Sequence, residues 1–143
     1  MENSSCKNRG VIQTKVNTMI NSIILYISAA MLIFWGIAHL VPTHSVVKNF
    51  GHVSMDNKRI ITMEWIIEGV FLIFIGSIIA VITYFDHKND VSIVIYLICF
   101  VALNILALVS LFTGFKIRFL PFRLCPFIFL TSAFLIIVAL FFI

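Results

Sequence analysis

Long apolar stretches alternate with short polar segments along the whole chain. The stretches cover residues 23–41, 65–85, 91–113 and 124–143. A helix needs roughly 20 apolar residues to cross about 30 Å of hydrocarbon, and each stretch is close to that length. No lipid-exposed strand arrangement could satisfy the backbone hydrogen bonds instead. The pattern therefore predicts four transmembrane helices.

The connections between the stretches set the topology. The tightest is a polar turn at residues 86–90, and the longest covers residues 42–62. Short loops make consecutive spans antiparallel neighbours, so we expect an all-α, up-down-up-down four-helix bundle with both termini on one side. The chain is predicted to hold a single membrane domain, residues 23–143. A polar N-terminal tail, residues 1–22, is expected to be mobile or to form a short surface helix.

The longest connection has its own apolar pattern. Pro42 stops the first helix, because proline lacks the backbone donor that a helix interior needs. Val46, Val47, Phe50 and Val53 follow at mostly helical spacing. This spacing predicts a short helix lying in the membrane interface.

Composition supports a membrane protein. The chain is 62% hydrophobic and 11% charged, whereas soluble domains carry roughly 25% charged residues. A cleaved signal peptide is the alternative for the first stretch. It fits poorly, because the small residues Ser28, Ala29 and Ala30 fall early and the apolar run continues through Trp35.

The positive charges leave the orientation open. Ten Lys and Arg residues against six Asp and Glu residues give a net charge of +4. More of them flank the loop side than the side of the termini, which weakly favours a cytoplasmic loop side, but the charges before the first helix argue the reverse. Cations that flank spans serve topology and anionic lipids, so we predict contact with the lipid bilayer and no nucleic-acid binding.

Small and aromatic residues suggest how the spans are placed. Gly69, Gly76, Ala80 and Thr83 fall roughly on one side of the second span, where they would let another helix approach closely. Tryptophans near span ends are typical of the interfacial belt, and Trp35 and Trp65 are predicted to lie there.

The polar groups of the spans converge at one end of the predicted bundle. Antiparallel spans bring the ends of spans one and three to the same membrane face as the starts of spans two and four. The candidate ligand-binding or proton-handling residues at that loop end are His39, Glu64, Glu68, Asn104 and Arg123. An ionisable group inside a span is costly, and by default it marks a function or a partner.

Each candidate also has a structural interpretation. Glu64 could be placed by the dipole at a helix N-terminus, and Asn104 could hydrogen bond across helices. Glu68 lies about 6 Å deeper than Glu64, at 1.5 Å per residue. It is either functional or part of a buried ion pair with a cation of the last connection. The candidate cations are Lys116, Arg118 and Arg123.

The cluster is compatible with several chemistries. Imidazole and carboxylate suit transition metals, which makes His39 and Glu68 the candidate ligands, but the chain lacks an H-x-x-x-H or H-E-x-x-H pattern and no metal site is predicted. The same pair could move a proton to or from a quinone. Haem with two histidine ligands is disfavoured, since the spans lack a second well-placed histidine.

The cysteines point away from thiol redox chemistry. Cys6, Cys99 and Cys125 are isolated, and a disulfide-exchanging enzyme needs a closely spaced pair. Cys99 and Cys125 are therefore predicted to be packing residues. We also find no nucleophile next to a base, which argues against an enzyme.

Two short motifs carry a family resemblance. Gly36-Ile37-Ala38-His39 ends the first span, and Glu64-Trp65-Ile66-Ile67-Glu68-Gly69 opens the second. Over these two spans the chain resembles the DoxX-like group of small four-helix membrane proteins. The resemblance implies a bacterial inner-membrane protein, linked in some members to quinone or thiol redox processes. It points to His39, Glu68 and Gly69, while the long connection after the first span departs from the group.

Two functional hypotheses follow. The first is a small inner-membrane bundle that binds an apolar or amphipathic ligand at the loop end, with a quinone as one candidate, as a subunit of a redox system. The second is a non-enzymatic partner subunit or minimal transporter with a structural ion pair between Glu68 and an arginine. A membrane-protein partner or a homo-oligomer is compatible with both hypotheses.

Overall fold

Five helices make up the described part of the chain, which contains no strand. The computed structural model describes the backbone of residues 2–48, 51, 53–114 and 120–141, and side chains from residue 13 on within these ranges, except 14 and 121. The helices are α1 (Glu2–Leu40), α2 (Thr43–Lys48), α3 (Met55–Asp86), α4 (Asp90–Thr113) and α5 (Leu120–Phe141). All but α2 are long and apolar enough to cross a membrane. The chain is therefore an integral, multi-pass membrane protein.

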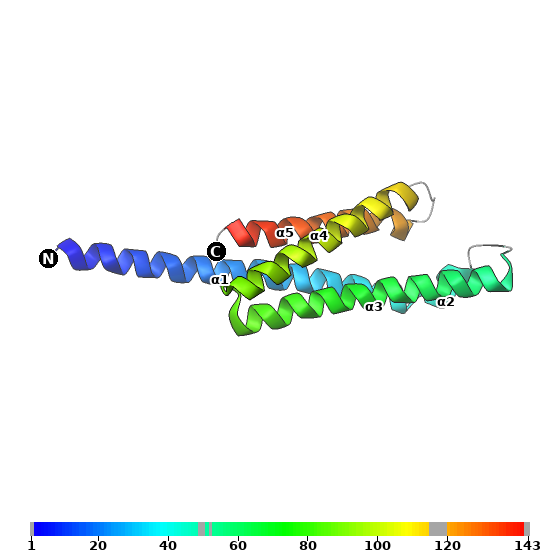
Figure 1. Ribbon diagram of the computed structural model, residues 1–143, viewed down its shortest axis with the longest axis horizontal. Helices are drawn as coiled ribbons and strands as arrows, with labels where there is room; N and C mark the ends of the chain where they lie inside the picture. The colour runs from blue at the N-terminus through cyan, green and yellow to red at the C-terminus, as the bar shows by residue number, and fades with distance from the viewer. Residues whose placement is uncertain (1, 49–50, 52, 115–119, 142–143) are drawn as a thin grey trace.

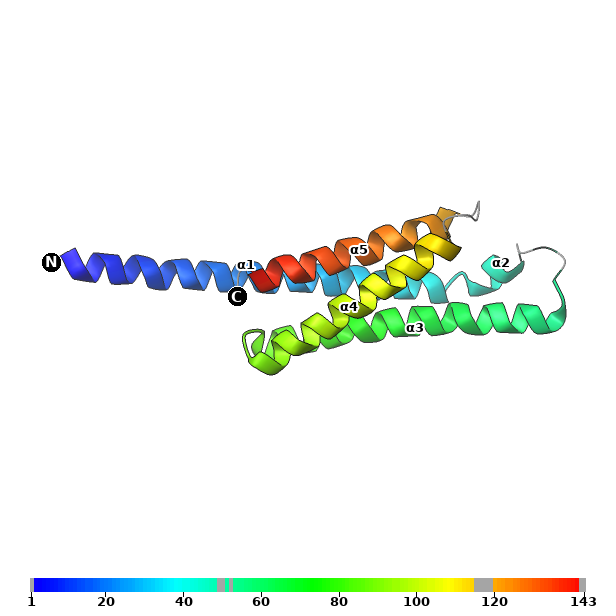
Figure 2. The ribbon, with the colours of Figure 1, turned by 45° about the horizontal axis from the view of Figure 1, so that its top comes forward.

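The long helices run alternately up and down, which confirms the predicted all-α four-helix bundle. The start of α1 and the end of α5 lie on the same side of the bundle (Figure 1). Helix α1 packs against both α3 and α5, and α4 packs mainly on α5. Helices α3 and α4 are joined by a tight turn and diverge from it, so they touch each other only sparsely (Figure 2).

Helix α1 is longer than the first apolar stretch. Residues 2–22, predicted as a separate tail, continue the helix without a break, and the part able to span a membrane begins at Lys15. Val16, Met19 and Ile20 lie on exposed parts of this helix and lengthen the apolar surface. Residues 2–40 contain no proline, so no residue of this type ends the helix before the span.

The connection after α1 is mostly helical. The predicted interfacial helix is present as α2, where Val46 and Val47 are buried, while Phe50 lies outside the described residues. Helix α3 begins at Met55, where the Ser54 side chain accepts a hydrogen bond from the Asn57 backbone. Its 32 residues extend about 48 Å, which exceeds the roughly 30 Å of hydrocarbon.

Glycines set the distance between α1 and α3. A Cβ on Gly36 would lie 2.6 Å from the Gly69 carbonyl oxygen, and a Cβ on Gly76 would lie 2.8 Å from that of Ala29. The two helices therefore cross with their backbones in contact, as small residues in membrane helices allow. The prediction for Gly69 and Gly76 is confirmed. Thr83 is buried as well, where its hydroxyl pairs with the Tyr96 hydroxyl at 2.9 Å.

The turn between α3 and α4 is closed by side-chain caps. Asn89 accepts a hydrogen bond from the Val91 backbone, and Ser92 donates to the Asp86 carbonyl. His87 ends α3 in this turn, outside the spans. Partial burial, with a smaller effect of Lys88, lowers the pKa of His87, and Asp86 opposes the shift.

We expect the His87 imidazole to lower the stability of the folded protein as the pH becomes acidic. A histidine whose pKa is lower in the folded than in the unfolded state binds fewer protons when folded, so stability decreases as pH drops through about 6.5. His87→Gln should reduce this decrease, measured by thermal unfolding in detergent between about pH 7.5 and 5. His44→Gln, at an exposed position in α2, is the control and should keep the wild-type slope.

Candidate functional site

His39 is held in a fixed orientation in the last turn of α1. Its side chain is 2% exposed, and its Nδ1 lies 2.9 Å from the Trp35 carbonyl oxygen one turn earlier. A carbonyl can only accept, so Nδ1 carries the hydrogen. This bond leaves Nε2 to face the neighbouring helices.

Trp65 of α3 packs on the His39 ring. The two rings stack with centroids 4.6 Å apart, and Trp65 Nε1 donates to the His39 carbonyl at 2.6 Å. The indole also makes a T-shaped contact with the Phe122 ring, with centroids 5.1 Å apart. Trp65 is 5% exposed, so its prediction as an interfacial belt residue is wrong. It is a buried support for the histidine.

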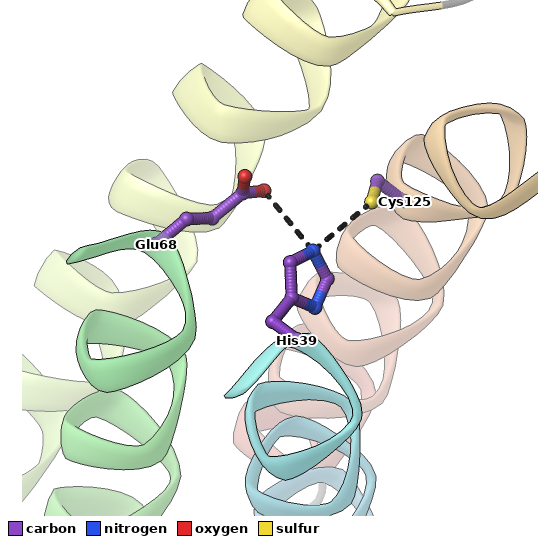
Figure 3. Close-up of side chains that lie close together, drawn as sticks. All are labelled: His39, Glu68 and Cys125. Carbon is purple, nitrogen blue, oxygen red and sulfur yellow. Dashed lines mark hydrogen bonds and ion pairs between the residues drawn. The ribbon is translucent and has the colours of Figure 1, made fainter. Parts of the chain in front are cut away.

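Two helices bring one side chain each to the free nitrogen of His39. Nε2 lies 3.9 Å from Glu68 Oε1 of α3 and 3.7 Å from Cys125 Sγ of α5 (Figure 3). The three atoms all lie within 4.8 Å of one another. We call His39, Glu68 and Cys125 the three-residue cluster. The sequence predicted the convergence of His39 and Glu68 at this end of the bundle.

Cys125 was missed as a member of this cluster. It is 1% exposed, which fits the predicted packing role, but its thiol also faces the histidine. Topology held a signal that could have found it. Cys125 lies near the start of span four, and the antiparallel order puts that start at the same membrane face as the end of span one.

The other predicted site residues have different surroundings. Glu64 is exposed and lies nine residues after the start of α3, so a helix N-terminus does not explain its position. The Asn104 amide donates to the Phe100 carbonyl of its own helix at 2.8 Å. Asn104 is not a member of the three-residue cluster. Arg123 is exposed on α5, and its pairing with Glu68 stays a prediction.

Glu68 has two environments. Its side chain is 29% exposed, and among the described residues its carboxylate faces the His39 imidazole. Lys116 and Arg118, the alternative partners, lie outside the described residues. Away from His39, Glu68 borders a groove between α3 and α4.

This groove, which we call the head groove, has a volume of about 440 Å³. It opens where α3 and α4 diverge. Polar groups at its walls come from Glu64, Glu68, Ser110 and Thr113. Apolar walls come from Ile67, Phe71, Leu106, Val109 and Phe122.

A second hollow, the tail groove, lies along the same two helices nearer the turn. It measures about 490 Å³ and has no polar wall surface. Its lining comes from Phe74, Ser77, Ile78, Val81, Ile82 and Ile95. The seam between α3 and α4 is thus polar at one end and apolar further in.

A comparison of the chain with known protein families, curated proteins and solved structures finds no match. The functional assignment therefore rests on the cluster, the two grooves and the residues that form them.

Proposed function

We propose that this membrane protein binds an amphipathic ligand, with a polar head and an apolar chain, in the seam between α3 and α4. A quinone is the ligand that fits best. The observation that carries the proposal is the polarity of the seam, because two carboxylate and two hydroxyl residues line the head groove while the tail groove has no polar wall surface.

The dimensions of the seam suit such a molecule. Glu68 and Ile78 lie ten residues apart on α3, which corresponds to about 15 Å along the helix axis. A head near Glu68 would therefore place its chain against the apolar walls of the tail groove. Ligand sites commonly combine apolar walls with a few polar groups that fix the orientation, and both grooves are of ordinary ligand-site size.

The polar end offers proton chemistry to the head of the ligand. A quinone carbonyl accepts hydrogen bonds and a quinol hydroxyl donates them. The Glu68 carboxyl and the Ser110 hydroxyl can serve either form, and His39 behind Glu68 can exchange a proton with it. A bacterial inner membrane and a redox partner protein are the setting that the DoxX-like motifs around His39 and Glu68 support.

The ligand assignment is tested by blocking the head groove. Val109→Phe adds volume to its wall, and Leu108→Phe is the matched control, since Leu108 does not line the groove and the two residues are 55% and 54% exposed. We expect Val109→Phe to weaken binding of a short-chain ubiquinone analogue by about tenfold, or 1.4 kcal/mol, and Leu108→Phe to leave it unchanged. Quenching of tryptophan fluorescence in detergent micelles measures both. Equal affinity in the two variants would contradict the proposal.

A structural role of Glu68 is the second candidate, in a partner subunit or minimal transporter. The contact with buried His39 favours it, because losing one member of a buried pair leaves the other without compensation. Glu68→Gln separates the candidates. Weaker quinone binding with unchanged unfolding supports the ligand site, whereas lower stability with unchanged binding supports the structural pair.

A further inference from the structure

The three-residue cluster has the composition and geometry of a metal site. We propose that His39, Glu68 and Cys125 bind a divalent transition-metal ion of the zinc type through Nε2, a carboxylate oxygen and Sγ. This inference goes beyond the ligand proposed for the seam, and ligand binding in the seam does not depend on it. A metal ion on Nε2 would replace the proton exchange between His39 and Glu68.

The distances already approach those of a tetrahedral site. Zinc lies about 2.0–2.2 Å from nitrogen or oxygen ligands and about 2.3 Å from sulfur, so tetrahedral donors are about 3.4–3.6 Å apart. The observed separations are 3.9 Å from Nε2 to Glu68 Oε1 and 3.7 Å from Nε2 to Cys125 Sγ. Side-chain movements of a few tenths of an ångström would bring both pairs to ligation distance. The Glu68 oxygen and the Cys125 sulfur, which lie within 4.8 Å of each other, must approach by up to about 1 Å.

The histidine is prepared for ligation through Nε2. Metal-bound histidines usually donate their other ring N–H to a carbonyl or a carboxylate, which fixes the ring and the tautomer. His39 Nδ1 makes this bond to the Trp35 carbonyl, and the stacked Trp65 holds the plane of the ring.

Charge balance favours the ion in this apolar surrounding. One carboxylate and one thiolate together neutralise a divalent cation, whereas an uncompensated charge at a buried position is costly. Binding breaks the S–H bond of Cys125 and forms the bond from sulfur to the metal, and the proton leaves to solvent. Binding should therefore weaken as the pH falls.

A buried donor next to the cluster adds support. The indole N–H of Trp35 is buried without a well-formed hydrogen bond, and its contact of this kind is a weak one with the Cys125 thiol. A neutral thiol is a weak acceptor, whereas a metal-bound thiolate is negatively charged and accepts such a bond well. Ligation would thus turn the weak contact of this donor into a stronger hydrogen bond.

Three protein ligands leave one tetrahedral position for a water molecule or another oxygen donor, as in catalytic zinc sites. Glu68 needs only one carboxylate oxygen for the ion, so its other oxygen can still serve the head groove.

Cobalt provides a direct test, because Co²⁺ replaces Zn²⁺ and its bond to a thiolate absorbs in the near ultraviolet. The background carries Cys6→Ser and Cys99→Ser, which makes Cys125 the remaining cysteine of the sequence. After removal of metal with a chelator, we expect one equivalent of Co²⁺ to produce the sulfur-to-cobalt band together with visible bands of four-coordinate cobalt. Zn²⁺ should abolish both.

Variants identify the ligands. Adding Cys125→Ser should abolish the sulfur-to-cobalt band, and His39→Ala and Glu68→Ala should each weaken binding by about tenfold or more. His87→Gln, at the opposite end of α3, should bind as the background does. Circular dichroism checks that each variant is folded. Absence of the band in the background, or its persistence after Cys125→Ser, would overturn the inference. The cobalt experiment contains no quinone, so a negative result there leaves the groove experiment unaffected.

Discussion

A single methyl group at Gly36 or Gly69 should force α1 and α3 apart. Gly36→Ala would place its Cβ 2.6 Å from a backbone carbonyl oxygen and 2.7 Å from the Ile73 side chain, and Gly69→Ala would place its Cβ 2.9 Å from the Gly36 carbonyl oxygen. Backbone atoms of a packed helix pair cannot yield locally, so the helices must shift as bodies. Overpacking of this kind costs about 1–3 kcal/mol, and we expect each variant to lose stability in that range.

The free energy of unfolding in mixed micelles, titrated with a denaturing detergent, measures this loss. Val70→Ile is the matched control, because it adds one carbon next to Gly69 on an exposed part of α3. It should stay close to the wild type. The Gly69 variant should also disturb the three-residue cluster, since its new Cβ would lie 3.0 Å from His39 Cβ. Wild-type stability in both alanine variants would show that the helices do not cross this closely.

Removing the Trp65 side chain should have the largest effect on stability. Trp65→Ala deletes a buried ring, its stacking on His39 and its hydrogen bond to the His39 carbonyl. Truncation of a buried aromatic residue costs about 3–5 kcal/mol. Trp65→Phe keeps most of the ring and should cost about 1 kcal/mol, the usual value of one hydrogen bond. The same unfolding titration measures both.

Phe34→Ala is the control for the Trp65 variants. It removes a comparable apolar group, but from the exposed surface of α1. Phe34→Ala should lower the free energy of unfolding much less than Trp65→Ala does. If the two alanine variants proved equally stable, Trp65 would be a surface residue, as the sequence had indicated. Trp65 would then be correctly assigned to the interfacial belt.

The sequence predicted the number and the order of the spans well, because the bilayer sets the length of an apolar helix. It also predicted the closely packed side of α3, since Gly69 and Gly76 stand out among large apolar residues. The rotation of each helix was harder to predict. In a membrane both the core side and the lipid side are apolar, so hydrophobic periodicity does not separate them.

Trp65 and Cys125 illustrate that difficulty. Trp65 begins the apolar run, yet α3 begins ten residues earlier, so the end of the run is not the end of the helix. Cys125 was classed as a packing residue because a lone cysteine resembles a small apolar side chain. Its neighbour His39 lies 86 positions away in the chain, and only the packing of α1 against α5 brings the two together.

The divergence of α3 and α4 has a consequence for how a ligand would be supplied. A seam that opens between two spans faces the acyl chains, so its occupant would exchange with molecules dissolved in the bilayer. Occupancy would then depend on the mole fraction of ligand among the lipids, and its concentration in water would matter little. Solubilising the protein in excess detergent dilutes that pool, so purification at a low ratio of detergent to lipid would best preserve the occupied state.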